Sequence, residues 1–436
     1  MADPGCSPPS PSPTAGRRLL PGGPFARFWA GHTSSNLADG VMLTALPLLA
    51  VTITTDPVAV AGLTVVWYLP WLLFGFHVGA LVDRIDQRVA MVTVNAVRAG
   101  CLGALSIFTL LGVRSIWLLY VAMFVAMTCE VVYDTAGRTV LPRIVARPEL
   151  RRANSRLEGG RIVTEGVLGG PVASVLFAVA AAAPLVLNAG AYLVGAALVL
   201  AVPLARRPGA AARRSAQPSG QPSHRPSLTR EAAAGLRFVW SDRVQRGMAL
   251  STVVATLAAG ALNAILVLFV TQTLGVPIAL YGVYMATSAI GGIIGAAICD
   301  RLTRRFGAAR VLVTVHLTLG GVLAAAALVP NIYVGAIAVG FLGLAMTVIN
   351  VVVISLLQVI TPEPIMGRAM ASRRTLAKAV GPLGALVGGA LGRWGLELPI
   401  LFAAVAVAAI PLVLRRTFHS AAERAASTTV DETEPG

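Results

Sequence analysis

The chain has little charge and almost no lysine, and both shortages restrict what it can be. Only 12% of its 436 residues are charged and 56% are hydrophobic, whereas roughly a quarter of the residues in a soluble domain are charged. A water-soluble fold is therefore disfavoured. Lys378 is the only lysine, and Ala377 precedes it. The common phosphate-binding loop, Gly-x4-Gly-Lys-Ser/Thr, is thus missing, and with it that kind of ATP site.

Cysteine is also scarce. The chain contains 4 cysteines, too few and too scattered for a disulfide framework. Cys101, Cys129 and Cys299 fall within apolar segments, where we expect them to be buried as small hydrophobic residues. The sequence also lacks the His-Glu-x-x-His and Cys-x-x-Cys spacings of metal sites and the elbow motif of a catalytic serine. We therefore expect no metal and no other cofactor.

What the chain has in abundance is long apolar segments. Continuous runs such as 58–80 fit membrane-spanning helices of about 20 residues, and not barrel strands, which alternate in segments of about ten residues. The sequence therefore predicts an all-α integral membrane protein with twelve transmembrane helices. The expected spans are 25–53, 58–82, 90–112, 116–137, 160–182, 184–205, 247–273, 278–299, 309–329, 332–357, 374–395 and 398–415.

The basic residues alternate along these spans. The net charge is +16, from 35 Lys and Arg against 19 Asp and Glu, but it is not gathered on one soluble face, as nucleic-acid binding would require. Alternate loops are basic, and the loops between them hold only Arg114 and Arg393. By the positive-inside rule, both termini and the basic loops are cytoplasmic and the protein lies in the cell membrane. The basic segments are Arg84 with Arg88, 138–161, 206–246, 301–310, 368–378 and 415–424.

Polar segments divide the chain into a tail, a helical bundle, a linker, a second bundle and a second tail. The first tail is rich in Pro, Ser and Gly, and we expect it to be disordered. No cleavable signal precedes the first span, which we expect to direct insertion itself. The linker begins with a Pro-rich disordered part and ends, at 229–246, in either an amphipathic helix on anionic headgroups or a plain linker helix. The five parts are 1–24, 25–205, 206–246, 247–416 and 417–436.

The two halves of the chain resemble each other. The second span ends in Gly79-Ala-Leu-Val-Asp83-Arg84, and the eighth ends in Ala296-Ala-Ile-Cys-Asp300-Arg301. Gly170-Pro171 in the fifth span matches Gly381-Pro382 in the eleventh in the same way. Such a parallel repeat predicts two pseudo-symmetric six-helix bundles related by an axis along the membrane normal, with a substrate path between them.

Two motifs resemble signatures of the major facilitator superfamily. The first-loop pattern Gly-x-Leu-x-Asp-Arg-x-Gly-Arg-Lys/Arg is met by Gly79, Leu81, Asp83, Arg84 and Arg88, with Asp86 and Gln87 at two departing positions. The fifth-helix pattern of exporters, Gly-x6-Gly-x3-Gly-Pro-x2-Gly, is met by Gly159, Gly166, Gly170 and Pro171, with Ser174 in the last place. This resemblance implies the major facilitator fold and favours export.

Longer stretches are similar to one branch of that superfamily, the enterobactin-exporter and macrolide-efflux type. The resemblance implies a transporter of a bulky small molecule and says little about which one. The similar stretches are 69–75, 130–136, 153–157, 360–368 and 382–386.

Charges at the cytoplasmic helix ends are candidates for a gate. A carboxylate there pairs with arginines or accepts from the N-terminus of a neighbouring helix, and such contacts hold that side shut. We expect Asp83, Arg84, Arg88 and Asp134 to form this latch. In the second half the equivalent residues are Asp300 and Arg301. The alternative is that all of them are ordinary interfacial charges.

Charged side chains inside apolar spans are candidates for ion coupling, because they cost about 2.5–3.5 kcal/mol at mid-helix. Asp39 lies near the middle of the first span, on the same helix face as Asn36. It is the first candidate to take a proton from one side and release it on the other; a carboxylate fixed by a buried hydrogen bond is the alternative. The further candidates for coupling are Arg98, Glu130, Glu165 and His316.

Arg98, Glu130 and Glu165 are expected to form a buried charge network, either exchanging partners between states or simply neutralising one another. His316 is either a titrating group or a satisfied core residue. Asn263 and Asn350 bind substrate or hydrogen-bond between helices.

The sequence thus favours a monomeric, proton-coupled exporter of an antibiotic, natural product or siderophore. The alternatives are an uptake symporter of a small solute and an integral-membrane enzyme acting on lipid, in which Asp39, Glu130 and Glu165 would be catalytic acids. The twofold repeat argues against the enzyme, since alternating access requires such a repeat and single-site catalysis does not.

Overall fold

The computed structural model describes residues 23–82, 85–203 and 228–431. In these ranges every regular element is helical, and 12 segments are long and apolar enough to cross a membrane. The predicted class and the predicted number of spans are confirmed. The N-terminal half contains α1 Pro24–Ile53, α2 Pro57–Val82, α3 Gln87–Leu110, α4 Ile116–Ile144, η1 Arg147–Glu149, α5 Leu150–Arg161, the π-helix η2 Ile162–Leu168, α6 Gly169–Val179 and α7 Ala183–Leu200.

The C-terminal half repeats this order. An additional helix, α9, precedes its first span. The elements are α9 Leu228–Ser241, α10 Arg243–Leu268 with the π-turn η3 Phe269–Thr273, α11 Ile278–Phe306, α12 Ala308–Leu328, α13 Ile332–Ile360, α14 Glu363–Gly392 and α15 Leu398–Asp431.

Short polar residues set several helix starts. Asp86 accepts hydrogen bonds from the backbone N–H groups of Arg88 and Val89, so it caps α3. Asp242 and Asn331 cap α10 and α13 in the same way. Asp86, a departure from the superfamily pattern, therefore has a local structural role.

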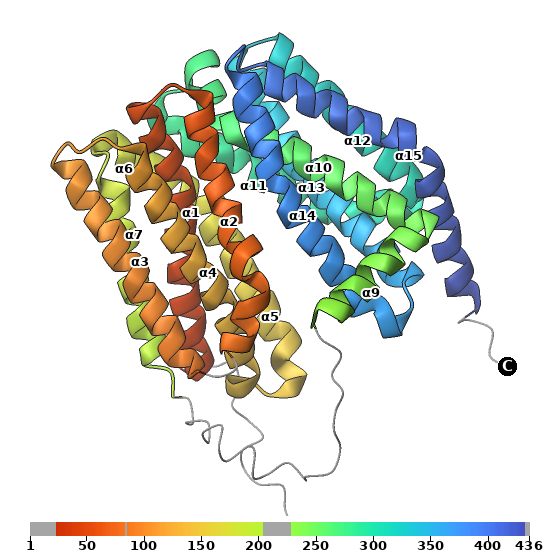
Figure 1. The fold of residues 1–436 in the computed structure, drawn as a ribbon, viewed down its shortest axis with the longest axis horizontal. Coiled ribbons are helices and arrows are strands. Elements are labelled where there is room, and N and C mark those ends of the chain that lie inside the picture. The colour runs from red at the N-terminus through yellow and green to blue at the C-terminus, as the bar shows by residue number, and fades with distance from the viewer. Residues whose placement is uncertain (1–22, 83–84, 204–227, 432–436) are drawn as a thin grey trace, which may run out of the picture.

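The two halves stand side by side, with α1 to α7 in one and α9 to α15 in the other (Figure 1). They meet through α2 with α14 and through α6 with α11. We call the end from which residues 204–227 leave the bundles the linker end, and the opposite end the far end. The halves converge toward the far end and diverge toward the linker end (Figure 1).

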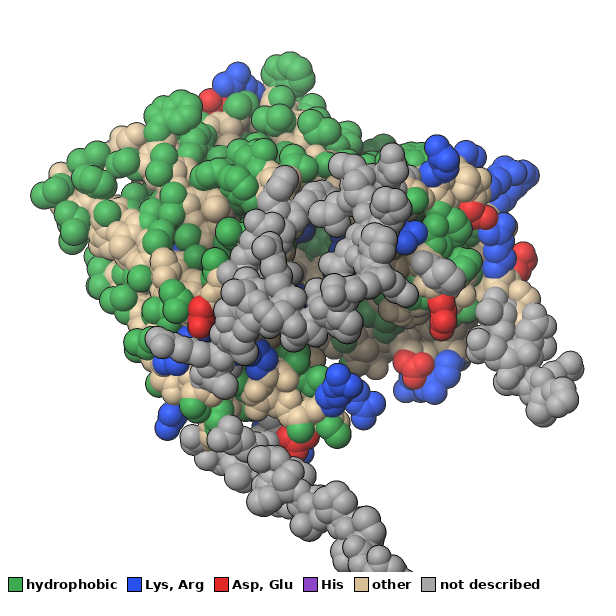
Figure 2. Space-filling view, turned by 60° about the horizontal axis from the view of Figure 1, so that its bottom comes forward, with side chains coloured by type: hydrophobic (Ala, Val, Ile, Leu, Met, Phe, Trp, Pro, Cys, Tyr) green, Lys and Arg blue, Asp and Glu red, His purple; other side chains and the backbone are tan. Residues whose placement is uncertain are grey.

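A shared hydrophobic core closes the far end. Leu46, Leu63 and Met123 of the N-terminal half belong to one buried cluster with Val267 and Tyr281 of the C-terminal half. Basic side chains stand around the margin of the linker end, over both bundles (Figure 2). The two ends of the molecule therefore differ in both packing and charge.

Several helices extend beyond the spans expected from hydropathy. α14 begins at Glu363 and not at 374, the fifth span is preceded by α5 from Leu150, and α15 continues to Asp431. The additional turns are polar and basic, so an average of hydropathy does not detect them. Consequently Lys378, expected at the border of a cytoplasmic loop, lies well inside α14.

A helix is present in the linker as α9, but it ends at Ser241, and the last residues of the expected stretch 229–246 begin α10 after Asp242. Helix α9 packs on α14 and α10, with Val239 buried beside Ala249 and Ala369. Leu236 and Trp240 remain exposed, at 41% and 38%. One face of α9 therefore rests on protein, and its exposed apolar residues leave a second face free to meet headgroups.

Candidate functional site

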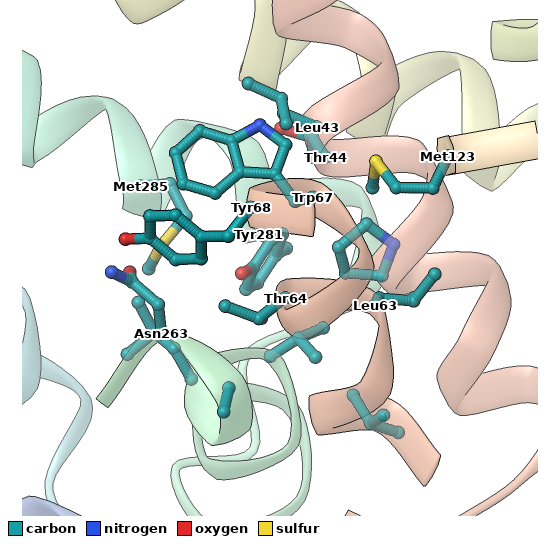
Figure 3. A pocket seen from close by; sticks show the side chains of 15 residues that line it. Leu43, Thr44, Leu63, Thr64, Trp67, Tyr68, Met123, Asn263, Tyr281 and Met285 are labelled. Atoms are coloured by element: carbon teal, nitrogen blue, oxygen red, sulfur yellow. The ribbon is translucent and has the colours of Figure 1, made fainter. Parts of the chain in front are cut away.

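A cavity of about 300 Å³ lies between the two halves. Residues of α1, α2 and α4 line one side, and residues of α10 and α11 line the other. Trp67, Tyr68, Asn263 and Met285 surround the same space (Figure 3). Most of the lining is apolar, and its polar groups are hydroxyls and the Asn263 amide. This lining suits an amphiphilic small molecule.

Three charged side chains meet inside the N-terminal half. Arg98 of α3 is wholly buried between Asp39 of α1 and Glu130 of α4. Its Nη1 lies 3.5 Å from Asp39 Oδ1, and its Nη2 donates a hydrogen bond to Glu130 Oε2. The hydroxyl of Tyr192 on α7 donates to Asp39 Oδ1 at 2.7 Å. We call Asp39, Arg98, Glu130 and Tyr192 the Arg98 cluster.

The cluster contains two carboxylates and one guanidinium, and the two carboxylates differ in their access to water. The side chain of Glu130 is 24% exposed, whereas that of Asp39 is 7% exposed. Along α1, Asp39 lies between one and two turns from the cavity residue Thr44. Along α4, Glu130 lies about two turns from the cavity residue Met123. The cluster therefore sits just on the linker side of the cavity.

A line of polar groups extends from the cluster toward the linker end. Tyr133 lies under the Arg98 guanidinium, 5.6 Å from ring centre to Cζ, and stacks on His32 at 5.5 Å. Ser35 donates to the Tyr133 hydroxyl at 3.3 Å and accepts from Asn95 at 2.8 Å. His32 also borders a second, smaller pocket of about 90 Å³. The sequence did not single out this line, because a neutral polar residue within an apolar span is a weaker signal than a charged one.

The exporter motif lies where α6 meets its neighbours. A Cβ at Gly282 of α11 would stand 1.8 Å from the carbonyl oxygen of Gly170, and the Gly282 N–H donates to Ser174 Oγ at 2.7 Å. The expected close packing is thus present at Gly170. Gly159 faces open space and Gly166 has ordinary contact with Ala289, so these two glycines are not needed for close packing in this structure.

Comparison with known proteins identifies the family. The family model described as transmembrane secretion effectors matches residues 20–434. The chain belongs to this family. It is a major facilitator transporter and not an enzyme, so the lipid-modifying alternative is removed.

Relatives of this secretion effector include efflux pumps. The multidrug efflux pump Tap of Mycolicibacterium fortuitum is 26% identical over 412 residues, covering 89% of this chain and 96% of Tap. Macrolide efflux protein A of Streptococcus pyogenes is 22% identical over 128 residues, 29% of this chain and 32% of that protein. The protein is therefore an efflux-type transporter of a small molecule.

Solved structures confirm the fold. A bacterial homologue of the iron transporter ferroportin in an inward-facing state has a TM-score of 0.69 at 15% identity, covering 92% of this chain and 98% of that one. The nucleoside transporter NupG has a TM-score of 0.65 at 13% identity, with 91% and 98% covered.

The predicted latch of this secretion effector is only partly within the described residues. Asp83 and Arg84 lie outside them. Asp134 pairs with Arg138 of its own helix at 3.1 Å, and a Cβ added at Gly79 would meet nothing within 4 Å. Asp134 therefore has a partner on its own helix in this conformation, and the latch as a whole stays a prediction.

The other gate residues also have local contacts. Asp300 pairs with Arg304, not Arg301, at 2.8 Å. Gln87, the second departure from the superfamily pattern, is buried and accepts from Arg143 Nη1 at 3.0 Å while donating to the Val82 carbonyl. Gln87 therefore ties the loop before α3 to the end of α4.

Of the remaining coupling candidates, Glu165 lies beside the Arg98 cluster, its backbone packed against Gly40, whereas His316 lies apart from it. Glu165 pairs with Arg161 at 3.3 Å, so of the expected network only Arg98 and Glu130 are directly paired in this structure. His316 is buried between α12 and α15, its Nδ1 2.7 Å from the Leu312 carbonyl and its ring stacked on Phe418. Its contacts are those of a satisfied core residue.

The three asparagine candidates are placed differently. Asn263 lines the cavity. Asn36 is buried on α1, and its Nδ2 has no partner among the described residues. Asn350 is exposed on α13 and is not among the residues that line this cavity.

Proposed function

We propose that this transporter exports a bulky amphiphilic molecule, such as an antibiotic, natural product or siderophore, in exchange for protons. The two halves rock about the central cavity, which opens to one side of the membrane at a time. The family and its efflux relatives support export. One observation supports proton coupling: two carboxylates, Asp39 and Glu130, share Arg98 beside that cavity.

The charge pattern supports a cytoplasmic linker end. Arg138 and Arg304 lie near the ends of α4 and α11 on this side, whereas Arg114 and Arg393 lie at the far end. Such an excess of arginine is typical of the cytoplasmic face. The conformation described here is then inward-facing, and both termini are cytoplasmic.

The charge balance of the Arg98 cluster gives it a reason to bind one proton. Arg98 neutralises one carboxylate, and a second ionised carboxylate leaves one net negative charge in the bundle. An uncompensated buried charge is costly, whereas a proton on either carboxylate makes the cluster neutral. Glu130, the more exposed of the two, offers the route to water on the linker side.

The driving force is sufficient for export. Moving one elementary charge through 100 mV supplies about 2.3 kcal/mol, which corresponds to roughly a fiftyfold gradient of a neutral substrate. A single proton per cycle is therefore adequate.

Proteoliposomes with an imposed pH gradient test this function. Asp39→Asn and Glu130→Gln should each abolish gradient-driven export while leaving substrate exchange at equal pH within about twofold. Glu397→Gln is the control, because Glu397 is an exposed carboxylate between α14 and α15, away from the cluster. Export by Asp39→Asn and Glu130→Gln at the wild-type rate would rule out coupling through this cluster.

Direction is tested in the same preparation. Everted vesicles that accumulate substrate when acidified inside support antiport. Accumulation in right-side-out vesicles that are acidified outside would support the uptake symporter. The monomeric state stays a prediction, to be measured by light scattering of the purified protein.

A further inference from the structure

Lys378 places a positive charge about midway along the candidate membrane span of α14, Ile365–Gly392. It is the only lysine in the chain. Charged residues at this depth are rare because they are costly, and those that occur usually mark a substrate or ion path. The Arg98 cluster does not use this residue.

Three aromatic rings of α2 surround the ammonium group. Lys378 Nζ lies 4.8 Å from the ring centre of Trp71, 5.4 Å from that of Trp67 and 5.8 Å from that of Tyr68. All three distances are within the range of a cation–π interaction. The rings therefore hold the cation in an apolar setting without neutralising its charge.

In the described part of the chain Lys378 has no carboxylate within 4 Å and no hydrogen-bond acceptor. Asp134 of α4, the carboxylate of the facing bundle that interacts electrostatically with Lys378, pairs with Arg138 at 3.1 Å. Its helical neighbour Arg373 donates twice to Gln245. The three N–H donors of Lys378 are thus left for an acceptor that comes from outside the protein.

The ammonium adjoins the central cavity. Trp67 and Tyr68, two of the rings that surround Lys378, also line that cavity (Figure 3). The Tyr68 ring lies against Gly381, one turn beyond Lys378 on α14, where a Cβ would approach it to 2.6 Å. Because α2 and α14 belong to opposite halves, a molecule bound here contacts both.

We propose that Lys378 binds an anionic group, a carboxylate or sulfonate, of an amphiphilic substrate whose ring system packs on Trp67 and Tyr68. The inference rests on the proposed function, since it assigns a substrate class to the same cavity. A carboxylate meeting an ammonium makes short, charge-assisted hydrogen bonds, which are strong in an apolar cavity. A substrate cation at this point meets a fixed like charge and is disfavoured.

Three dansyl compounds that differ only in head group test the charge preference. Dansylglycine carries a carboxylate, dansylglycinamide is neutral and dansylethylenediamine carries an ammonium. Binding to the purified full-length protein in lipid nanodiscs is followed by energy transfer from tryptophan, with empty nanodiscs correcting for partition into lipid. Wild type should bind dansylglycine at least about tenfold more tightly than the other two.

Two variants locate this preference at the lysine. Lys378→Met keeps a long apolar side chain without charge, and it should lose the preference for dansylglycine while binding dansylglycinamide as wild type does. That unchanged neutral binding shows that the variant is folded. Lys378→Arg should keep the preference, because the charge remains.

The results that overturn the inference are distinct from those that overturn the proposed function. Equal binding of the three compounds, preference for the ammonium compound, or no saturable binding of dansylglycine would each reject an anion site at Lys378. Gradient-driven export by wild type would remain in all these cases. Loss of that export, with the dansylglycine preference retained, would instead reject the transport function and leave the anion site standing.

Discussion

Arg393 holds Asp56 with two parallel hydrogen bonds across the boundary between the halves. Nε donates to Asp56 Oδ1 at 3.1 Å, and Nη2 donates to Oδ2 at 3.0 Å. Asp56 lies just before α2, and Arg393 follows α14 at the far end. The paired forks of guanidinium and carboxylate fix the relative orientation of both helices. This ion pair therefore favours the conformation in which the far end is closed.

Breaking this pair should shift the protein toward a far-end-open state. Asp56→Asn removes the charge, and an exposed pair of this kind is expected to change the population only roughly two- to fivefold. Electron–electron resonance distances between spin labels at positions 114 and 330 measure the opening. The exchanged variant Asp56→Arg with Arg393→Asp should restore closure. Unchanged distances in Asp56→Asn would mean that the pair has no gating role.

Closure of the far end should also depend on pH, but only in acidic solution, where Asp56 becomes protonated. The hydrogen bond from Arg393 holds the pKa of Asp56 below its ordinary range. A lowered pKa means that the stabilisation is complete above the ordinary value of about 3.9 and is lost as the pH falls through the lowered value. The distance between labels at 114 and 330 should therefore stay constant from pH 8 to 5. A transition in that window that persists in Asp56→Asn would originate elsewhere, with the Arg98 cluster as first candidate.

The contact of α6 with α11 should tolerate no side chain at Gly282. In Gly282→Ala the new Cβ would lie 1.8 Å from the Gly170 carbonyl oxygen, so the helices must separate, at a cost of about 1–3 kcal/mol. We expect at least tenfold slower export. Gly190→Ala is the control, because that position has no neighbour within 4 Å. Equal rates in the two variants would show that the close contact is not required.

Removing Arg98 should destabilise the fold more than removing its partners. Arg98→Met leaves two carboxylates in the bundle without a cation, and breaking a buried pair in this way costs roughly 3–5 kcal/mol. Thermal unfolding of the purified protein should show a clear drop in Tm. The triple variant with Asp39→Asn and Glu130→Gln should recover most of it. A triple variant as unstable as Arg98→Met alone would indicate that Arg98 acts through packing and not through charge.

The two asparagines of the C-terminal half should differ in their effect on substrate. Asn263→Ala removes the amide that faces the cavity, and loss of one hydrogen bond should raise the apparent KM by about tenfold or less. Asn350→Ala, at an exposed position on α13, should leave KM within twofold. KM values from the proteoliposome assay decide the comparison, and the opposite order would exclude the cavity as the substrate site.

Much of the Arg98 cluster could be predicted from the sequence residue by residue, but which side chains pair with which could not. Asp39, Arg98 and Glu130 stand out in the sequence because each is a charge within an apolar span. Glu165 stands out equally, yet it turns to Arg161 on its own helical segment. Which carboxylate reaches Arg98 depends on how α1, α3 and α4 are rotated against one another, and hydropathy does not define rotation.

Lys378 is an instructive failure of prediction. Its neighbours Arg373 and Arg374 made it part of a basic loop in the sequence, because hydropathy averaged over a window blurs the helix start. The helix begins at Glu363, so Lys378 lies midway along it and against three rings of the other half. The signal in the sequence would have been a charged residue that lies more than one helical turn inside a predicted span.

The sequence by itself determined the membrane class, the twelve spans, the twofold repeat and the alternation of basic loops, because all of these follow from where apolar and charged residues stand along one chain. Only the tertiary structure decided that Arg98 is shared by Asp39 and Glu130, that Gly282 meets Gly170, and that Lys378 contacts aromatic rings of α2 across the boundary between the halves. These contacts join residues far apart in sequence, and they are set by helix rotation and by the packing of side-chain shapes between helices.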